Sequence, residues 1–303
     1  MLRANDLSIS SLLYRRLTEV QLDKLHQATL EVLEDTGIKF TEPEALELFK
    51  KGGAYVDGQL VRIPVHLVEW ALRTAPKHLT LYDQTGEPAI HLNGRVSYFG
   101  NGSDLLYIID HRTGERRLPE LDDVVDIMRV LNKLDNINYI MSGFLPRNVP
   151  VDKAELLQTR EMLKYTNKPL VYVVTELSLA QKVIEMAEIV AGGEEALRQR
   201  PFAACYINIA NPLRHNPESI QKLIWLSRKG LPFVYRPALV TRGVSTPLTG
   251  AGFLVVQNAA GLAGLVLSQL VREGTPFIRD ACAGGTFDMQ HMVGQQSPPE
   301  IRG

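Results

Sequence analysis

The sequence contains few cysteines and no cluster of cysteines or histidines with metal-ligand spacing. Cys205 and Cys282 are the only cysteines among 303 residues, and neither belongs to a CxxC pair. Two distant thiols fit a reducing compartment better than a disulfide framework. The seven histidines are scattered without an HExxH pattern, and single ones such as His215 and His291 are more often surface or helix-end residues than bases. We therefore predict no metal site in this chain.

Motifs for nucleotide binding and for nucleophilic catalysis are also absent. The sequence has no GxGxxG after the first predicted strand, no Walker loop and no GxSxG elbow. The formal net charge is -1 without long runs of like charge, which indicates neither a nucleic acid nor an anionic membrane surface as partner. The N-terminal residues lack the apolar stretch and cleavage site of a signal peptide, so we expect a cytoplasmic protein.

What the sequence does have is one long apolar segment, Thr241–Leu270, which opens on a polar loop containing glycine and proline. Thr249 is placed to cap a helix over 249–271. A helix that is apolar on every face must be buried, either in a protein core or in a membrane. The amide side chains of Gln257 and Asn258 would be costly inside a membrane, so we expect the central helix of an α/β protein without a membrane span.

From Ile137 onward, short apolar segments alternate with helices. The predicted strands are 137–141, 170–174, 202–208, 232–236 and 276–280, and the predicted helices between them are 153–166, 178–191, 216–229 and 249–271. This alternation indicates parallel βαβ units. Because the loops after the strands are long and polar, we favour a TIM-type (β/α) barrel over an open sheet. A complete barrel takes about 250 residues, so we expect it to be incomplete at the C-terminus and the chain to be a fragment of a longer protein.

The first part of the chain has a different pattern. Thr18 is placed to cap a helix that Gly37 ends, and further helices are predicted over 42–51 and 65–74, with a short strand over 61–64 between them. Four short alternating runs follow, HLTLYD, PAIHLN, RVSYFG and LLYIID, with a turn at 111–114, and they predict a small antiparallel sheet. We thus expect an N-terminal helical and antiparallel β subdomain over 1–118. Residues 119–303 would form the first five βα units of a (β/α)8 barrel.

Polar residues that follow the predicted strands are the first candidates for a site, because ligands bind at the carboxyl ends of parallel strands. Asn208 and Asn211 follow one strand, and their amides can bind a ligand; alternatively they cap the next helix, where Asn216 is the strongest candidate. Arg236 ends the next strand and can hold a substrate carboxylate with two hydrogen bonds. The alternative is an ion pair between Arg236 and Asp280 on the neighbouring strand.

Two further groups of residues are candidates. The loop 244–250 offers the hydroxyls of Ser245 and Thr246, beside Pro247, at a helix N-terminus that favours anions; ordinary capping is the alternative. Aromatic rings can surround a methylated ammonium, since their faces attract a cation that donates no hydrogen bond. The candidates for such a cage, which can equally be core residues, are Tyr98, Phe99, Tyr107, Tyr206, Tyr235 and Phe287.

Four stretches together resemble the trimethylamine methyltransferase family: LHQATLEVLEDTGIKFTEPEA (25–45), SYFGNGSDLLYIID (97–110), STPLTGAGFLVVQNAAGLAGLVLSQLVREGTP (245–276) and GGTFDMQHMVGQQSPPE (284–300). The resemblance covers essentially the whole chain and keeps its order, and its specificity lies in that succession. It implies a TIM-type barrel that moves a methyl group from a methylamine or quaternary amine to the Co(I) of a separate corrinoid protein. The chain lacks the D-x-H-x-x-G motif of corrinoid proteins, so we expect no tightly bound cofactor of its own.

The resemblance also implies site residues. The positions that match the family's pocket are Tyr98, Gly100, Asn101, Asn211, Pro247, Phe287 and Asp288. Members of the family are longer, and the catalytic pyrrolysine of the trimethylamine enzymes lies downstream of a Ser-Pro-Glu motif. This chain ends just after that motif, in which it has an extra proline, 297–300, so we expect the catalytic residue beyond it.

Other readings of the sequence remain open. The first is a non-catalytic subunit that binds a quaternary amine or serves assembly. The second is a phosphate-binding lyase or isomerase, although the lysine or glutamate that such chemistry needs is not evident. For the methyltransferase we expect a homo-oligomer that works with a cognate corrinoid protein and a small methylated amine, such as trimethylamine or glycine betaine.

Overall fold

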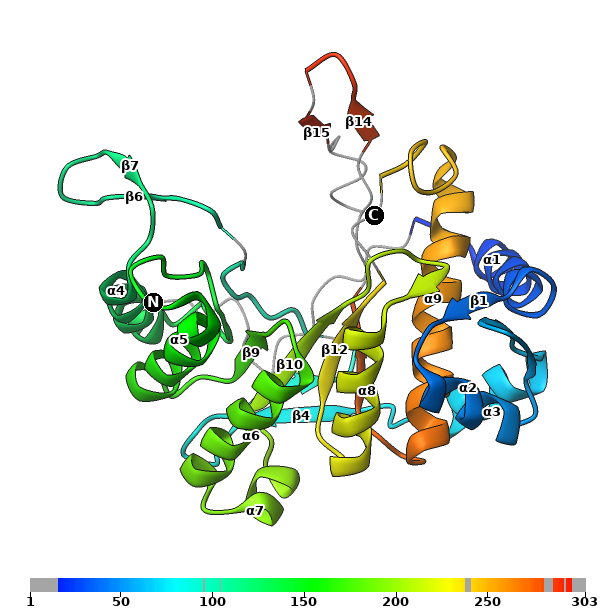
Figure 1. The fold of residues 1–303 in the computed structure, drawn as a ribbon, viewed down its shortest axis with the longest axis horizontal. Helices are drawn as coiled ribbons and strands as arrows, with labels where there is room; N and C mark the ends of the chain where they lie inside the picture. The colour runs from blue at the N-terminus through cyan, green and yellow to red at the C-terminus, as the bar shows by residue number, and fades with distance from the viewer. Residues whose placement is uncertain are drawn as a thin grey trace. The chain divides into compact units, whose positions relative to one another are not determined.

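A computed structural model describes residues 16–94, 96–103, 105–237, 241–280, 286–291 and 293–295. The chain is a mixed α/β protein (Figure 1). Contact density divides it into two units, which are treated separately below. Unit 1 contains the described residues of 77–206, and unit 2 contains the described residues of 14–76 and 207–303. This grouping does not test the sequence-based boundary at residue 118, which stays a prediction.

The largest sheet in the described part of the chain has five strands. They are β8 (Ile140–Met141), β9 (Leu170–Val173), β10 (Ala203–Asn208), β12 (Phe233–Arg236) and β13 (Phe277–Arg279), in the order β13-β12-β10-β9-β8. β8, β9 and β10 pair in parallel, as do β12 and β13. All five strands lie inside the predicted segments, so this prediction is confirmed. The described strands do not close into a barrel.

The helices that follow the strands also agree with the prediction. They are α5 (Val151–Tyr165), α6 (Leu177–Ala191), α8 (Pro217–Lys229) and α9 (Gly250–Val271). A short helix, α7 (Glu194–Gln199), was not predicted. It begins directly after Gly192 and Gly193, which both have positive φ and together turn the chain out of α6.

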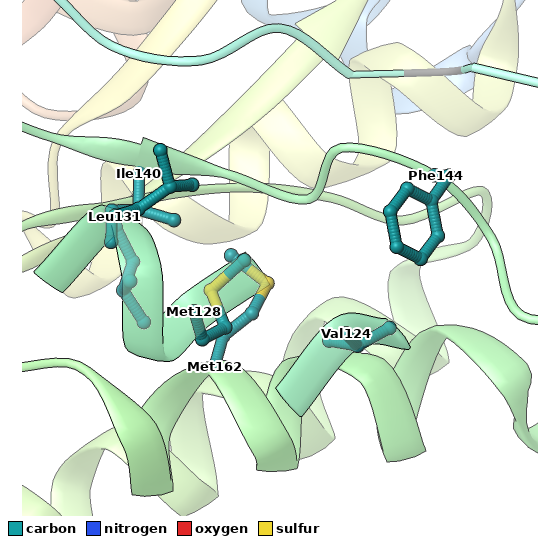
Figure 2. Packing of buried hydrophobic residues seen from close by; sticks show 7 residues of the cluster. Val124, Met128, Leu131, Ile140, Phe144 and Met162 are labelled. Carbon is teal, nitrogen blue, oxygen red and sulfur yellow. The ribbon is translucent and has the colours of Figure 1, made fainter. Parts of the chain in front are cut away.

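Unit 1 has its core between α4 (Leu121–Lys133), α5 and the first strands of the sheet. The buried side chains of this core are Val124, Met128, Leu131, Ile140, Phe144, Met162 and Leu170 (Figure 2). The first turn of α4 is closed by a capping box between Glu120 and Asp123. The apolar stripe of α4 therefore anchors β8, the edge strand of the large sheet, to this unit.

The predicted antiparallel sheet of unit 1 is wrong in its arrangement. The structure has two separate hairpins, β4 (Leu79–Tyr82) with β5 (Pro88–Leu92), and β6 (Ile108–Ile109) with β7 (Arg116–Arg117). Residues 96–99 form no strand. The chain instead runs beside β8, with parallel bridges from Gly100 to Tyr139 and from Leu105 to Phe144. Gly100 permits this because a Cβ there would lie 2.4 Å from the Tyr139 ring.

Unit 2 is organised around α9. The helices α1 (Glu19–Glu31), α2 (Pro43–Lys51), α3 (Val65–Thr74) and α8 pack against it. Thr18 caps α1 through a capping box with Gln21, and after a π-helical turn, η1 (Val32–Thr36), the chain leaves at Gly37 with φ 76°. These predicted helix starts and stops are confirmed.

A second sheet in unit 2 was largely missed from the sequence. Its strands are β1 (Ile38–Phe40), β2 (Tyr55–Asp57), β3 (Leu60–Arg62) and β11 (Arg214–His215), in the order β11-β1-β3-β2. Only the strand near 61–64 was predicted. β1 and β11 pair in parallel although they lie far apart in the sequence. Strands of two or three residues are too short to show a periodic pattern.

α9 is long and apolar enough to cross a membrane, but 61% of its apolar window is buried inside the protein. Thr249 caps it as predicted, because Thr249 Oγ1 accepts a hydrogen bond of 3.2 Å from Gly252 N–H. The amide of Asn258 donates to Thr29 Oγ1 at 3.2 Å. α9 is therefore apolar on most faces because it packs against other helices inside unit 2.

Candidate functional site

The loop between β10 and α8, residues 209–216, is held by side-chain hydrogen bonds to its own backbone. Asn211 Oδ1 accepts from Leu213 N–H at 3.1 Å, and Asn216 Oδ1 accepts from Ala210 N–H at 3.2 Å. Ser219 Oγ donates to the carbonyl of Asn208 at 2.6 Å. Asn216 stands at the N-cap position of α8, but its oxygen bonds to the loop instead of the helix. Asn216 therefore occupies the predicted N-cap position without a capping hydrogen bond from its side chain, and the side chains of Asn211 and Asn216 hold the loop.

His215 lies at the end of this loop, directly before the N-cap of α8, and is fully buried, so its interpretation as a surface residue is wrong. Its Nε2 lies 3.2 Å from the carbonyl oxygen of Pro212, and its Nδ1 lies 2.8 Å from Tyr235 Oη. A carbonyl can only accept, so Nε2 carries the proton and Nδ1 accepts from the Tyr235 hydroxyl. Burial lowers the pKa of His215 to about 3, although the Pro212 carbonyl opposes this shift. His215 is thus neutral and connects the loop to β12 through its hydrogen bonds to Pro212 and Tyr235.

The same loop is joined to the N-terminal part of unit 2. Lys39 N–H donates to the carbonyl of Leu213 at 3.0 Å, and Thr41 Oγ1 donates to the carbonyl of His215 at 3.3 Å. The ring of Phe40 meets His215 edge-on, with centroids 4.6 Å apart. Hydrogen bonds on several sides therefore hold the backbone that carries Asn211.

Arg236 and Asp280 form the ion pair that the sequence offered as an alternative. Arg236 Nη1 lies 3.3 Å from Asp280 Oδ2, and the two side chains are 22% and 25% exposed. Asp280 N–H also donates to the carbonyl of Tyr235 at 3.0 Å, which fixes Asp280 at the end of β13. The charge of Arg236 is directed at the carboxylate of Asp280. Asp280 would therefore compete with a substrate carboxylate for the predicted contact with Arg236.

The loop before α9 also uses its hydroxyls internally. Ser245 Oγ accepts from Thr241 N–H at 3.0 Å, and Thr246 Oγ1 donates to the carbonyl of Thr241 at 3.3 Å. Thr249 caps the helix, and Pro247 is exposed between these residues. These contacts agree with the capping alternative, while the role of the loop in ligand binding stays a prediction.

In unit 1, the site candidates gather beside the carboxyl end of β8. The amide of Asn101 pairs with the backbone of Met141 like a neighbouring strand, because Oδ1 accepts from Met141 N–H at 2.8 Å and Nδ2 donates to Met141 O at 2.9 Å. Tyr98 Oη accepts from His91 N–H at 3.0 Å. Gly100 allows the close approach to Tyr139. Gly100 and Asn101 thus lay one segment of the chain against β8, and Tyr98 joins the same segment to β5.

Replacing Asn101 with alanine is expected to lower the free energy of unfolding by about 1–2 kcal/mol, because it removes two partly buried hydrogen bonds. Asn101→Asp keeps the acceptor for Met141 N–H, but it places a carboxylate oxygen against the Met141 carbonyl oxygen, where Asn101 has a donor. The two oxygens repel each other, so this variant should not restore stability. Urea unfolding and hydrogen exchange of the Met141 amide measure both effects. Asn211→Ala, in the other unit, is the control that should leave the exchange of Met141 unchanged. Wild-type exchange in Asn101→Ala would contradict this structural role.

The predicted aromatic residues have different surroundings. Tyr206 and Tyr235 are buried core residues, as the alternative interpretation stated. The Tyr107 ring lies under the guanidinium of Arg116 at 3.9 Å, and Phe99 is exposed. A cation cage built from these rings stays a prediction.

The remaining candidates stand near the end of the chain. Phe287 and Asp288 belong to β14 (Thr286–Asp288), which pairs with β15 (Val293–Gln295), and their side chains lie outside the described residues, as does Cys282. The thiol of Cys205 is buried. Within the described residues, no group of three or more His, Cys, Asp or Glu side chains is placed to hold a metal ion.

Comparison with known proteins gives one consistent result. The sequence model of the family described as trimethylamine methyltransferase (MTTB) matches residues 7–291. The trimethylamine methyltransferase MttB of Desulfitobacterium hafniense is 33% identical over 94% of this chain and 57% of its own length. The glycine betaine methyltransferase of D. hafniense strain Y51 is 29% identical over 88% and 55%, respectively. The proline betaine:corrinoid methyltransferase of Eubacterium limosum is 28% identical over 93% and 59%. The chain therefore spans a little over half the length of these relatives.

Proposed function

Because this chain belongs to the trimethylamine methyltransferase family, we propose that it is part of a methyltransferase that moves a methyl group from a methylamine or quaternary amine to the Co(I) of a separate corrinoid protein. The observation that carries the proposal is the family match over residues 7–291. The names of relatives specify trimethylamine, glycine betaine and proline betaine as methyl donors. We further propose that the parallel sheet belongs to a TIM-type barrel in a cytoplasmic homo-oligomer.

The proposed reaction makes few chemical demands on the protein. Co(I) of a corrinoid is the nucleophile that takes the methyl group. As it does so, the carbon–nitrogen bond of a quaternary donor breaks and the bonding electron pair stays on nitrogen. The leaving group of a quaternary donor, or of a methylamine that is already protonated, is then a neutral amine, so no general acid is required. The protein has to orient the methyl group, exclude water and surround the cation.

The described residues are compatible with such a role. His215, the buried histidine of the β10–α8 loop, is neutral and fully hydrogen-bonded, so it supports the loop and is not available as an acid. We propose that the residues of unit 2 that contact the donor are Asn211, Arg236, Ser245, Thr246, Pro247, Phe287 and Asp288. Tyr98, Gly100 and Asn101 are the proposed positions in unit 1. No residue of this chain is assigned to hold the corrinoid, which belongs to the partner.

A non-catalytic role is the second candidate. The observation that favours it is that the amides of Asn101 and Asn211, both proposed for the site, are engaged in hydrogen bonds with the backbone. A subunit of this kind would bind a quaternary amine, or serve assembly, without turning the amine over.

Methyl transfer by the full-length gene product tests the proposal. Cob(I)alamin is incubated with trimethylamine, glycine betaine or proline betaine, and its methylation is followed by absorbance. We expect transfer from at least one donor. A folded protein that methylates cob(I)alamin with none of them would contradict the proposal. Binding of a quaternary amine by calorimetry without any turnover would instead support the non-catalytic role.

A further inference from the structure

Gln158, on α5, is a polar side chain buried inside unit 1. It is 3% exposed, and Met162, one helical turn later, belongs to the apolar core of this unit (Figure 2). An amide in such surroundings costs free energy unless it is hydrogen-bonded. Its Nε2 donates to the carbonyl of Ser142 at 2.8 Å and also to the carbonyl of Phe144. Because carbonyls only accept, the two hydrogens of Nε2 serve these two oxygens. Gln158 thus joins α5 to the chain that leaves β8.

The two carbonyls flank a tight turn at the carboxyl end of β8. Phe144 N–H donates to the carbonyl of Ser142 at 2.8 Å, which closes a γ-turn around Gly143. Gly143 has φ 73°, a conformation that a residue with a Cβ rarely adopts. Turns of this hand are rare and strained, so such a turn persists only where its surroundings hold it. Gln158 supplies that support, because it binds the carbonyl on each side of Gly143.

The Gly143 turn also holds the segment that contains the proposed site positions of unit 1. Gly143 N–H donates to the carbonyl of Gly102 at 3.1 Å, and the carbonyl of Gly143 accepts from Leu105 N–H at 3.0 Å. The side chain of Asn101 pairs with the backbone of Met141, at the end of β8. Asn101, Gly102 and Leu105 are therefore fixed to the end of β8 and to the turn that α5 supports.

We propose that Gln158 is a positioning residue of the donor pocket. By holding the Gly143 turn, Gln158 places Gly100 and Asn101, which are proposed above to contact the methylated amine. This inference rests on the proposed function, because it names a residue that acts on the same pocket without touching the donor. Ligands bind at the carboxyl ends of parallel strands, and a misplacement of about 1 Å in such a pocket can reduce a reaction rate about a hundredfold. The loss of the Gln158 amide should therefore be felt by the donor.

Gln158→Met tests this role. Methionine has nearly the same length as glutamine but no donor, so the carbonyls of Ser142 and Phe144 lose this partner. We expect the KM for the methyl donor to rise at least about tenfold with kcat within about twofold of the wild type, because a displaced segment loses contacts that are made in the ground state and transition state alike. The measurement is methyl transfer to cob(I)alamin by the full-length gene product, from whichever of trimethylamine, glycine betaine and proline betaine the wild type uses best.

Thr159→Val is the matched control. Thr159 follows Gln158 on α5, is 2% exposed, and donates from Oγ1 to the carbonyl of Glu155 at 2.8 Å. The variant removes a buried hydrogen bond of α5 without reaching the Gly143 turn, so KM should stay at the wild-type value. Gly143→Ala changes the turn without changing Gln158. A Cβ at Gly143 would meet Asn101 Nδ2 at 3.7 Å, an ordinary contact, so this variant acts through φ and should raise KM as Gln158→Met does.

Hydrogen exchange reports directly on the turn. The amides of Gly143 and Leu105 should exchange faster in Gln158→Met than in the wild type, and at the wild-type rate in Thr159→Val. Circular dichroism verifies folding, and Gly143→Ala carries the test where Gln158→Met does not fold. Unchanged exchange in Gln158→Met, or faster exchange with a wild-type KM, would overturn the inference. An equal rise of KM in Thr159→Val would also overturn it. A wild type that methylates cob(I)alamin with none of the three donors contradicts the proposed function as well, whereas failure of this inference alone requires an active wild type.

Discussion

Gly264→Ala is expected to destabilise the protein by about 2 kcal/mol. A Cβ at Gly264 would lie 2.3 Å from the ring of Tyr235. That ring is fully buried, and its hydroxyl is bonded to His215, so it has no space to move. Overpacking of a well-packed core typically costs 1–3 kcal/mol, occasionally more. This cost exceeds the gain of about 1 kcal/mol that alanine brings to a helix in place of glycine.

Gly261 provides a matched control on the same helix. A Cβ there would lie 2.4 Å from Nε of Arg279, but this atom belongs to a long, flexible side chain that can shift. Gly261→Ala should therefore destabilise less than Gly264→Ala, because the Arg279 side chain can shift more readily than the buried Tyr235 ring. Urea unfolding of both variants gives the comparison. Equal changes in the two variants would show that contact with Tyr235 does not determine the need for glycine at position 264.

Acidification is expected to reduce stability through His215. Burial lowers its folded-state pKa to about 3 from an unfolded value of 6.5. Between these values the unfolded state binds one more proton than the folded state. The contribution of His215 to stability is therefore complete above pH 6.5 and is lost as the pH falls toward 3, by about 1.4 kcal/mol for each pH unit.

The pH window from 4.5 to 6.5 isolates this effect, because the lowered pKa values of Asp110 and Asp123 act at more acidic pH. His215→Gln removes the titrating group while leaving a side chain that can donate and accept. As the pH is lowered, the free energy of unfolding of His215→Gln should fall less steeply than that of the wild type. The two slopes should differ by the uptake of one proton, about 1.4 kcal/mol for each pH unit. The slope is the measurement, since the variant also changes packing at pH 7. Parallel slopes in urea titrations of the two proteins would contradict the assignment of a neutral, buried His215.

The same contact links His215 to the proposed site. Protonation of Nδ1 would remove the acceptor for the Tyr235 hydroxyl, and the loop that carries Asn211 would lose this side-chain contact with β12. Acid should therefore loosen residues 209–216 before it unfolds the rest of unit 2. Hydrogen exchange of this loop between pH 5 and 7 is a direct observation of that order.

The sequence by itself determined the helices and strands whose signals are local. Thr18 and Thr249 cap their helices, and Gly37 ends one, because a cap is made with backbone groups three to five residues away. The five parallel strands followed from apolar runs bounded by helices, which periodicity reveals. The order of four segments also sufficed to indicate the family, which the match over 7–291 confirmed.

Only the tertiary structure decided which polar groups meet. Asn101 pairs with Met141 forty residues away, and His215 bonds to Tyr235 twenty residues away. The two-residue strand β11 finds its partner β1 in the N-terminal part of the chain. A side chain of asparagine or histidine has the same local signature whether it binds a ligand, caps a helix or braces a loop. Its role depends on burial and on the donors and acceptors that folding brings to it, and these are set by packing over long sequence distances.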